Sequence, residues 1–112
     1  MGPLTTELCD RLRETAGLLS RVGESHWRRW LETSLRRIEN SDLSGVDHLL
    51  GAYGGMGSFN DLVLSPPNAP VTMTDEFREL NDRLDELRSE LYRLARAVRS
   101  NAEIAAPPIR TS

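Results

Sequence analysis

The sequence predicts an all-α fold, a small helical bundle of three short helices, a glycine-rich turn with a short element, and one long C-terminal helix. Three observations predict this fold. Apolar residues recur three and four positions apart through residues 5–22, 25–39 and 43–53, as on one face of a helix. The same spacing continues without a break through residues 75–100. Glycines and prolines, which end helices, separate these stretches.

The first predicted helix starts after Pro3, with Thr5 as its expected N-cap. Gly23 is expected to end it. Gly17 is expected to weaken its interior by roughly 1 kcal/mol relative to alanine, unless this glycine allows close packing. The face that we expect to be buried carries Leu8, Leu12, Thr15, Leu18, Leu19 and Val22.

The second predicted helix runs from about Ser25 to Glu39, and the third from about Leu43 to Tyr53. Asn40-Ser41-Asp42 is a turn and cap signal between them, and Gly54-Gly55 is expected to end the third. The second helix is amphipathic, with an apolar face of Trp27, Trp30, Leu31, Leu35 and Ile38.

A glycine-rich stretch follows, from Gly54 to Leu64. Ser58 and Asp61 have the spacing of a capping box, with aspartate in place of the usual glutamate. We interpret the stretch as a turn that leads into a short helix at about 59–64. A short buried strand is the alternative, because three consecutive apolar residues do not determine a period.

The predicted organisation is a helical domain over residues 1–64, a Pro-rich linker over 65–74, a long amphipathic coiled-coil helix over 75–100 and a flexible tail over 101–112. Thr74 is the expected N-cap of the long helix. Its large apolar residues form one heptad seam: Phe77, Leu80, Leu84, Leu87, Leu91, Leu94 and Val98.

Seven large apolar side chains must be buried, either against the rest of the chain or against another chain. We expect another chain, either a second copy in a homodimer or a helical protein partner, with the heptad seam as the interface. Acidic residues dominate the first part of this helix and arginines its end. This distribution complements the helix macrodipole and favours an antiparallel partner.

Composition excludes several classes of protein. The chain has 112 residues, a net charge of −3 and one cysteine, Cys9, so neither an intramolecular disulfide nor a cysteine-rich zinc site is possible. All 14 basic residues are arginine, which excludes lysine chemistry and suits a high-GC bacterial genome. No apolar run approaches the ~18 residues of a membrane span. The first residues lack the pattern of a secretory signal, so a cytoplasmic protein is expected.

The block from Gly54 to Leu62, Gly-Gly-Met-Gly-Ser-Phe-Asn-Asp-Leu, follows an amphipathic helix that carries Trp27 and Trp30-Leu31. Together they resemble a family of small bacterial proteins catalogued as a domain of unknown function. The resemblance covers residues 27–64. It implies a bacterial, cytoplasmic protein and brings no activity with it.

The glycine-rich turn supplies the candidate ligand- or partner-binding residues Gly55, Gly57, Ser58, Asn60 and Asp61. Glycines before a helix N-terminus can direct backbone N–H groups at an anion such as phosphate. The interpretation that we favour is structural: the glycines supply positive φ for a tight turn, and Ser58 is the cap.

Other constellations carry less weight. His48, Ser58 and Asp61 have the residue types of a hydrolytic triad but lie in no nucleophile motif. His26 and His48 have no second ligand at helical spacing, so we expect no metal and no cofactor. An arginine-rich face on the second helix suggests a solvated face or an acidic protein partner rather than nucleic acid, because the whole chain is acidic: Arg28, Arg29, Arg36 and Arg37.

We therefore expect a protein-interaction module that is not an enzyme, of the accessory, antitoxin or immunity kind. It would self-associate or bind a partner helix through the heptad seam. The alternative is a small anion- or nucleotide-binding domain that uses the turn at Gly55–Ser58.

Overall fold

The computed structural model describes residues 2–55, 57–66 and 74–104. All regular secondary structure in these ranges is helical, so the predicted all-α fold is confirmed. The elements are α1 (Pro3–Arg21), α2 (Ser25–Glu39), α3 (Ser44–Leu50), the short 3-10 helices η1 (Gly51–Tyr53) and η2 (Phe59–Asp61), and α4 (Asp75–Ser100).

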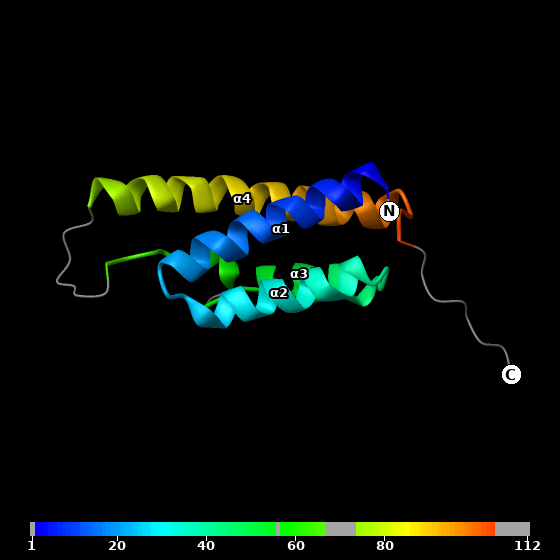
Figure 1. Cartoon of the computed structure of the whole chain (residues 1–112), viewed down its shortest axis with the longest axis horizontal. Helices are drawn as coiled ribbons and strands as arrows, with labels where there is room; N and C mark the ends of the chain where they lie inside the picture. The colour runs from blue at the N-terminus through cyan, green and yellow to red at the C-terminus, as the bar shows by residue number, and fades with distance from the viewer. Residues whose placement is uncertain (1, 56, 67–73, 105–112) are drawn as a thin grey trace, which may run out of the picture.

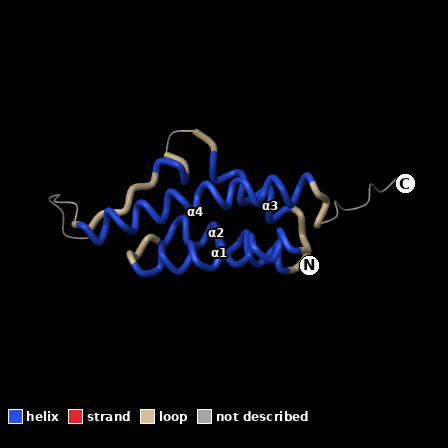
Figure 2. The backbone as a smooth tube through the Cα atoms, turned by 90° about the horizontal axis from the view of Figure 1, so that it is seen from above, coloured by secondary structure: helices blue, strands red, loops and turns tan. Residues whose placement is uncertain are grey.

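The four α-helices surround one core. α1 contacts α2 and α4, and α3 contacts the same two helices. α1 runs antiparallel to both α2 and α4 (Figure 1). Seen from above, α1 and α2 form one layer and α4 lies in a second layer with α3 (Figure 2). The turn between η1 and η2 lies on the side of this second layer that faces away from α1 (Figure 2).

The heptad seam of α4 lies in this core. Its five C-terminal members are completely buried within the single chain: Leu84, Leu87, Leu91, Leu94 and Val98. Phe77 and Leu80, near the start of α4, are only partly buried. The expectation that the whole seam faces another chain is therefore corrected, because α1 and α3 already cover most of it.

The N-terminus of α1 differs from the prediction. The helix begins at Pro3, whose fixed φ and missing N–H suit a first helical position, and Gly2 is the N-cap. Thr5 is a buried residue of the first turn and not the cap. Carboxylate oxygens of Glu103, just beyond α4, accept hydrogen bonds from the N–H groups of Leu4 and Thr5 at 3.2 and 2.8 Å. A distant side chain therefore caps this helix.

The connection between α2 and α3 is tight. Asp42 accepts a hydrogen bond from the N–H of Ser44 at 2.9 Å, which fixes the predicted turn, whereas the N-cap of α3 is Leu43 and makes no side-chain cap. Gly45 lies so close to α2 that a Cβ atom there would be 2.8 Å from the carbonyl oxygen of Ser34. The third predicted helix is present but changes from α to 3-10 geometry after Leu50.

The predicted short helix at 59–64 is only the single turn of η2, and residues 62–66 are not helical. The capping box is also wrong, because Ser58 makes no side-chain cap. Asp61 instead accepts a hydrogen bond from the N–H of Gly57 at 2.7 Å. Leu64 is bound to α4 by the Asn81 amide, which pairs with its N–H and carbonyl at 2.7 and 2.8 Å.

Most of the predicted linker lies outside the described residues, as does the tail beyond residue 104. Thr74 caps α4 as predicted, and its hydroxyl accepts a hydrogen bond from the N–H of Phe77 at 3.3 Å. Residues 101–104 are not loose, because Ile104 is 5% exposed and Glu103 binds α1. α4 therefore completes the bundle, and it shares its core with residues 1–64.

Candidate interaction site

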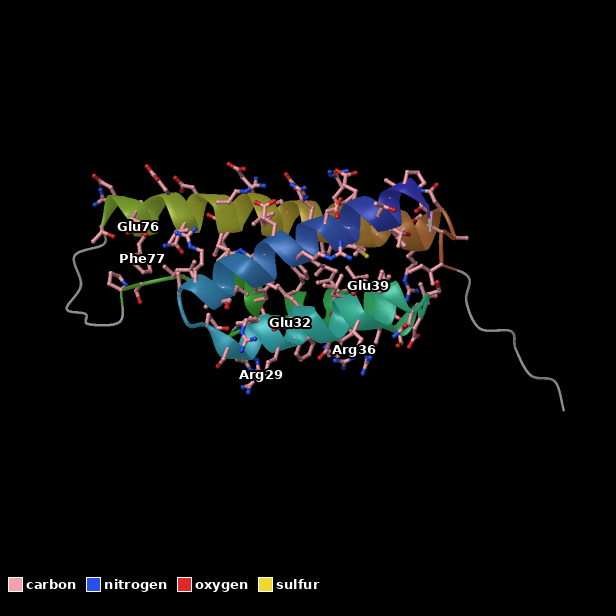
Figure 3. The ribbon with its side chains drawn as sticks, in the orientation of Figure 1. Arg29, Glu32, Arg36, Glu39, Glu76 and Phe77 are labelled. Carbon is pink, nitrogen blue, oxygen red and sulfur yellow. The ribbon has the colours of Figure 1, made fainter. Side chains whose placement is uncertain are left out.

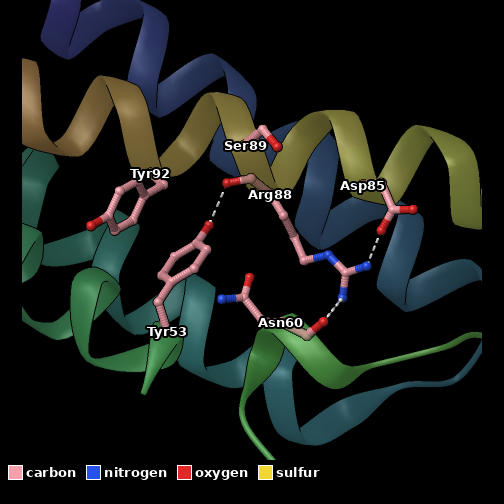
Figure 4. Close-up of a pocket in the computed structure, with 6 residues that line it drawn as sticks. All are labelled: Tyr53, Asn60, Asp85, Arg88, Ser89 and Tyr92. Atoms are coloured by element: carbon pink, nitrogen blue, oxygen red, sulfur yellow. Dashed lines mark hydrogen bonds and ion pairs between the residues drawn. The ribbon is translucent and has the colours of Figure 1, made fainter. Parts of the chain in front are cut away.

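Arg88 of α4 holds the segment that follows the glycine-rich turn. Its guanidinium Nη1 donates to the carbonyl oxygens of Phe59, Asn60 and Leu62 at 2.7, 3.1 and 2.9 Å. Its Nη2 pairs with the carboxylate of Asp85 (Figure 4). Arg88 is 9% exposed, so these bonds meet the requirement that a buried charge be hydrogen-bonded and paired.

Tyr53 joins the other side of the turn to the same helix. Its hydroxyl donates to the backbone carbonyl of Arg88 at 2.7 Å (Figure 4). Burial raises the pKa of Tyr53 well above the ordinary tyrosine value, and the nearby Arg88 charge offsets this only in part. The phenol therefore stays neutral and keeps its proton for this hydrogen bond.

An open pocket of about 450 Å³ lies between the turn and α4, lined by Tyr53, Asn60, Asp85, Arg88, Ser89 and Tyr92 (Figure 4). Two further hollows, of about 340 and 360 Å³, adjoin it. One shares Asp85 and Arg88 with the pocket, and the other shares Tyr53 and Tyr92. The three hollows form one groove along α4, which we call the α4 groove.

Two exposed hydrophobic side chains line the α4 groove. Among the described residues, Val63 and Tyr92 are the large hydrophobic residues that stay exposed, at 65% and 40%. Val63 lines the hollow near the start of α4, and Tyr92 lines the two others. Exposed apolar groups that gather around one concavity are typical of an interaction surface.

Of the five predicted turn residues, one lines the α4 groove. Asn60 lines the central pocket. Gly55 and Gly57 have φ of +83° and +76°, the left-handed backbone that the structural interpretation required. Ser58 is 8% exposed, and its hydroxyl has no hydrogen-bond partner among the described residues. Asp61 lies at the exposed end of η2.

Two of the described amides of the turn already have acceptors within the protein. The N–H of Gly57 donates to Asp61, and the N–H of Ser58 donates to the carbonyl of Gly55 at 3.3 Å. An anion at these amides would have to displace the Asp61 carboxylate. The observed bonds therefore give the anion-binding alternative no support.

The predicted triad residues have other surroundings. The imidazole of His48 stacks on Trp30, with ring centroids 4.2 Å apart. Burial lowers the pKa of His48, and Arg37 lowers it further. Trp27 and Trp30 are partly buried against the core rather than displayed for stacking on bases. In the described ranges, no group of three or more His, Cys, Asp or Glu side chains could hold a metal ion.

Arg88, Tyr53 and Tyr92 were missed as site residues by the sequence reasoning. Arg88 did carry a signal: Leu84, Leu91 and Ala95 lie four residues before it and three and seven after it, which places an arginine on the apolar side of the helix. Tyr53 had no comparable signal for its hydrogen bond, because the acceptor at Arg88 lies 35 residues away along the chain.

Comparison with known proteins adds one match. The profile of a family described as a domain of unknown function (DUF6966) matches residues 20–72, slightly less than half of the chain. It spans α2, α3 and the glycine-rich turn, and it overlaps the resemblance stated for residues 27–64. No curated protein and no solved structure matches the chain. No helix among the described residues is long and apolar enough to cross a membrane.

Proposed function

We propose that this protein is a non-enzymatic interaction module that binds a protein partner along the α4 groove. The observation that carries the proposal is the position of Val63 and Tyr92, the two exposed large hydrophobic residues among those described, on the walls of one groove. This location differs from the heptad seam of the sequence prediction, of which Phe77 and Leu80 alone are partly exposed.

The residues that line the α4 groove are of the types found in protein–protein interfaces. The tyrosine side chains combine a large apolar ring with a polar tip, a type enriched in protein interfaces. Their rings lie close together, with the centroids of Tyr53 and Tyr92 5.2 Å apart. Asn60 and Ser89 add hydrogen-bonding groups beside them. Arg88 and Tyr53 fix the glycine-rich turn against α4, so the groove is formed before any partner arrives.

The finer parts of the proposal rest on the sequence alone. The exclusive use of arginine and the Gly-Gly-Met-Gly-Ser-Phe-Asn-Asp block support a bacterial source. The composition, with a single cysteine, supports a cytoplasmic location. A role of the accessory, antitoxin or immunity kind follows only by analogy with other small acidic proteins.

Site-specific photo-crosslinking in the cells of origin tests the proposal. A benzophenone amino acid would replace Val63 or Tyr92, with the protein at its native level. The matched control positions are Arg29 and Arg36, exposed on the outer face of α2 away from the groove (Figure 3). We expect discrete adducts from the two groove positions and none from the controls. Groove positions without adducts, or equal labelling at the controls, would overturn the proposal.

A further inference from the structure

The outer face of α4 carries Arg78, which pairs with Asp75, and six further charged residues, of which three before Ser89 are acidic and three after it are arginines. These six side chains are all exposed: Glu79, Asp82, Asp85, Arg93, Arg96 and Arg99. This face points away from the heptad seam and borders the α4 groove, because Asp82, Asp85 and Arg96 also line its hollows. Ser89, at the centre of the face, is small and exposed.

These six charges are symmetric about Ser89 in position and opposite in sign. Asp82 and Arg96 each lie seven residues from Ser89. Asp85 and Arg93 lie four residues away, and Glu79 and Arg99 lie ten. When two such helices cross antiparallel about a twofold axis at Ser89, Asp82 and Asp85 lie opposite Arg96 and Arg93 of the second copy, whereas Glu79 and Arg99 lie at the edges of the contact.

Several of these charged side chains form no ion pair within the described part of the chain. Asp82 and Arg93 form no ion pair in the described ranges. Arg96 donates to the Tyr92 hydroxyl at 3.0 Å and lies over the Tyr92 ring, without a carboxylate partner in the described part of the chain. Asp85 and Arg99, by contrast, already pair with Arg88 and Asp47. The pair of Asp82 with Arg96 of a second copy is therefore the one we expect to matter most.

In the same twofold arrangement, the second copy covers the exposed hydrophobic residues of the α4 groove. Val63 lines one hollow with Asp82 and Asp85, and Tyr92 lies beside Arg96. Placing Asp82 opposite Arg96 of a second copy therefore brings Val63 toward Tyr92 of that copy, and the reverse contact follows by symmetry. A twofold interface needs this kind of self-complementary surface.

We propose that the partner bound at the α4 groove is a second copy of this chain, docked antiparallel through the outer face of α4 with Ser89 on the twofold axis. The inference rests on the proposed function and names its partner. The hydrophobic contacts supply affinity, while the charges set orientation and register. Because these charges are exposed, dimerisation weakens as salt concentration rises.

Light scattering coupled to size exclusion, with the full chain at several concentrations, tests the dimer. We expect a mass near twice the 12.6 kDa of one chain. Asp82→Arg and Arg96→Asp should each raise the dimer dissociation constant by about 10-fold or more, since each reversal acts twice across the axis. The double variant should restore most of the affinity by exchanging the charges. Arg36→Asp on α2 is the control for net charge and should leave the dissociation constant unchanged.

A second measurement does not depend on charge. In a Cys9→Ala background, Ser89→Cys places two thiols at the axis, and mild oxidation should give a covalent dimer. Ser20→Cys, exposed near the end of α1, is the control and should form no covalent dimer. Far-UV circular dichroism confirms that each variant is folded.

The inference is overturned by a monomer at about 100 µM protein, by a dimer that ignores both charge reversals, or by equal disulfide formation at Ser20. Its failure is distinct from failure of the proposed function. A monomer that still forms adducts with another protein at Val63 and Tyr92 keeps the groove as an interaction site and excludes the second copy as its occupant.

Discussion

The Glu103 carboxylate accepts hydrogen bonds from both the backbone N–H and the hydroxyl of Thr5, at 2.8 and 2.9 Å, although 98 residues separate the two in sequence. Glu103 thus caps α1 from the far end of α4. Burial raises the pKa of Glu103, but these bonds and the one from the Leu4 N–H outweigh it, and the pKa falls below its ordinary value of 4.5. The two ends of the described chain are joined by this carboxylate.

Acid should therefore weaken the fold through Glu103. Because the folded pKa is lowered, the stabilisation is present above pH 4.5 and is lost as the pH falls through the folded value. We expect Glu103→Gln to lower the free energy of unfolding at pH 7 and to make little difference at pH 3. Urea titrations of both proteins across this range measure the difference. A difference in the free energy of unfolding that does not change with pH would contradict the prediction. Thr5→Val, which removes one of the donors to Glu103, should show part of the same effect.

Two glycines should respond to alanine with opposite signs. At Gly45 a Cβ atom would meet the Cβ of Arg37 and the carbonyl oxygen of Ser34, both at 2.8 Å, so Gly45→Ala should destabilise by about 1–3 kcal/mol. At Gly17 nothing lies within 4 Å of the new atom, so Gly17→Ala should stabilise α1 by about 0.5–1 kcal/mol. Thermal unfolding of both variants checks the signs. If the two variants change the stability equally, then α2 and α3 can move apart at Gly45 without a loss of stability.

Removing the Arg88 guanidinium should loosen the glycine-rich turn. Arg88→Met keeps a long apolar stem but leaves three backbone carbonyls without their donor. We expect a loss of ~2–3 kcal/mol in chemical denaturation, together with faster hydrogen exchange of the Leu62 N–H. Arg29→Met, on the exposed face of α2 away from the groove, is the control and should stay within about 0.5 kcal/mol of the parent.

Tyr53 should resist ionisation in the folded protein. A Tyr92→Phe variant leaves Tyr53 as the one tyrosine of the chain, so phenolate absorbance near 295 nm reports on it alone. The folded pKa is raised, so its stabilising contribution is complete below the ordinary value of 10 and declines as the pH rises toward the folded value. We expect little phenolate at pH 10 in the folded state and about half in urea. If Tyr53 titrates with the same pKa in the folded protein and in urea, the prediction is wrong.

The limits of sequence reasoning can be seen in α4. Its bounds, its cap and its heptad seam were predicted, because helical spacing and capping depend on residues near one another in the chain. The spacing shows that the seam must be buried but not what buries it, and α1 and α3 of the same chain cover five of its seven residues. The Glu103 cap and the Arg88 contacts join segments 98 and 26–29 residues apart, so no local pattern marks them.

The hydrogen bonds from α4 to residues 59–64 reach main-chain atoms, while Phe59 and Leu64 are also held by their buried side chains. Arg88 binds carbonyl oxygens, and Asn81 binds the N–H and carbonyl of Leu64. A peptide backbone offers these atoms whatever its side chains are. The exposed positions of this segment, such as Asn60 and Val63, are therefore free to change over evolution while the backbone path stays fixed. The scaffold can thus acquire a new binding preference without first finding a new way to fold.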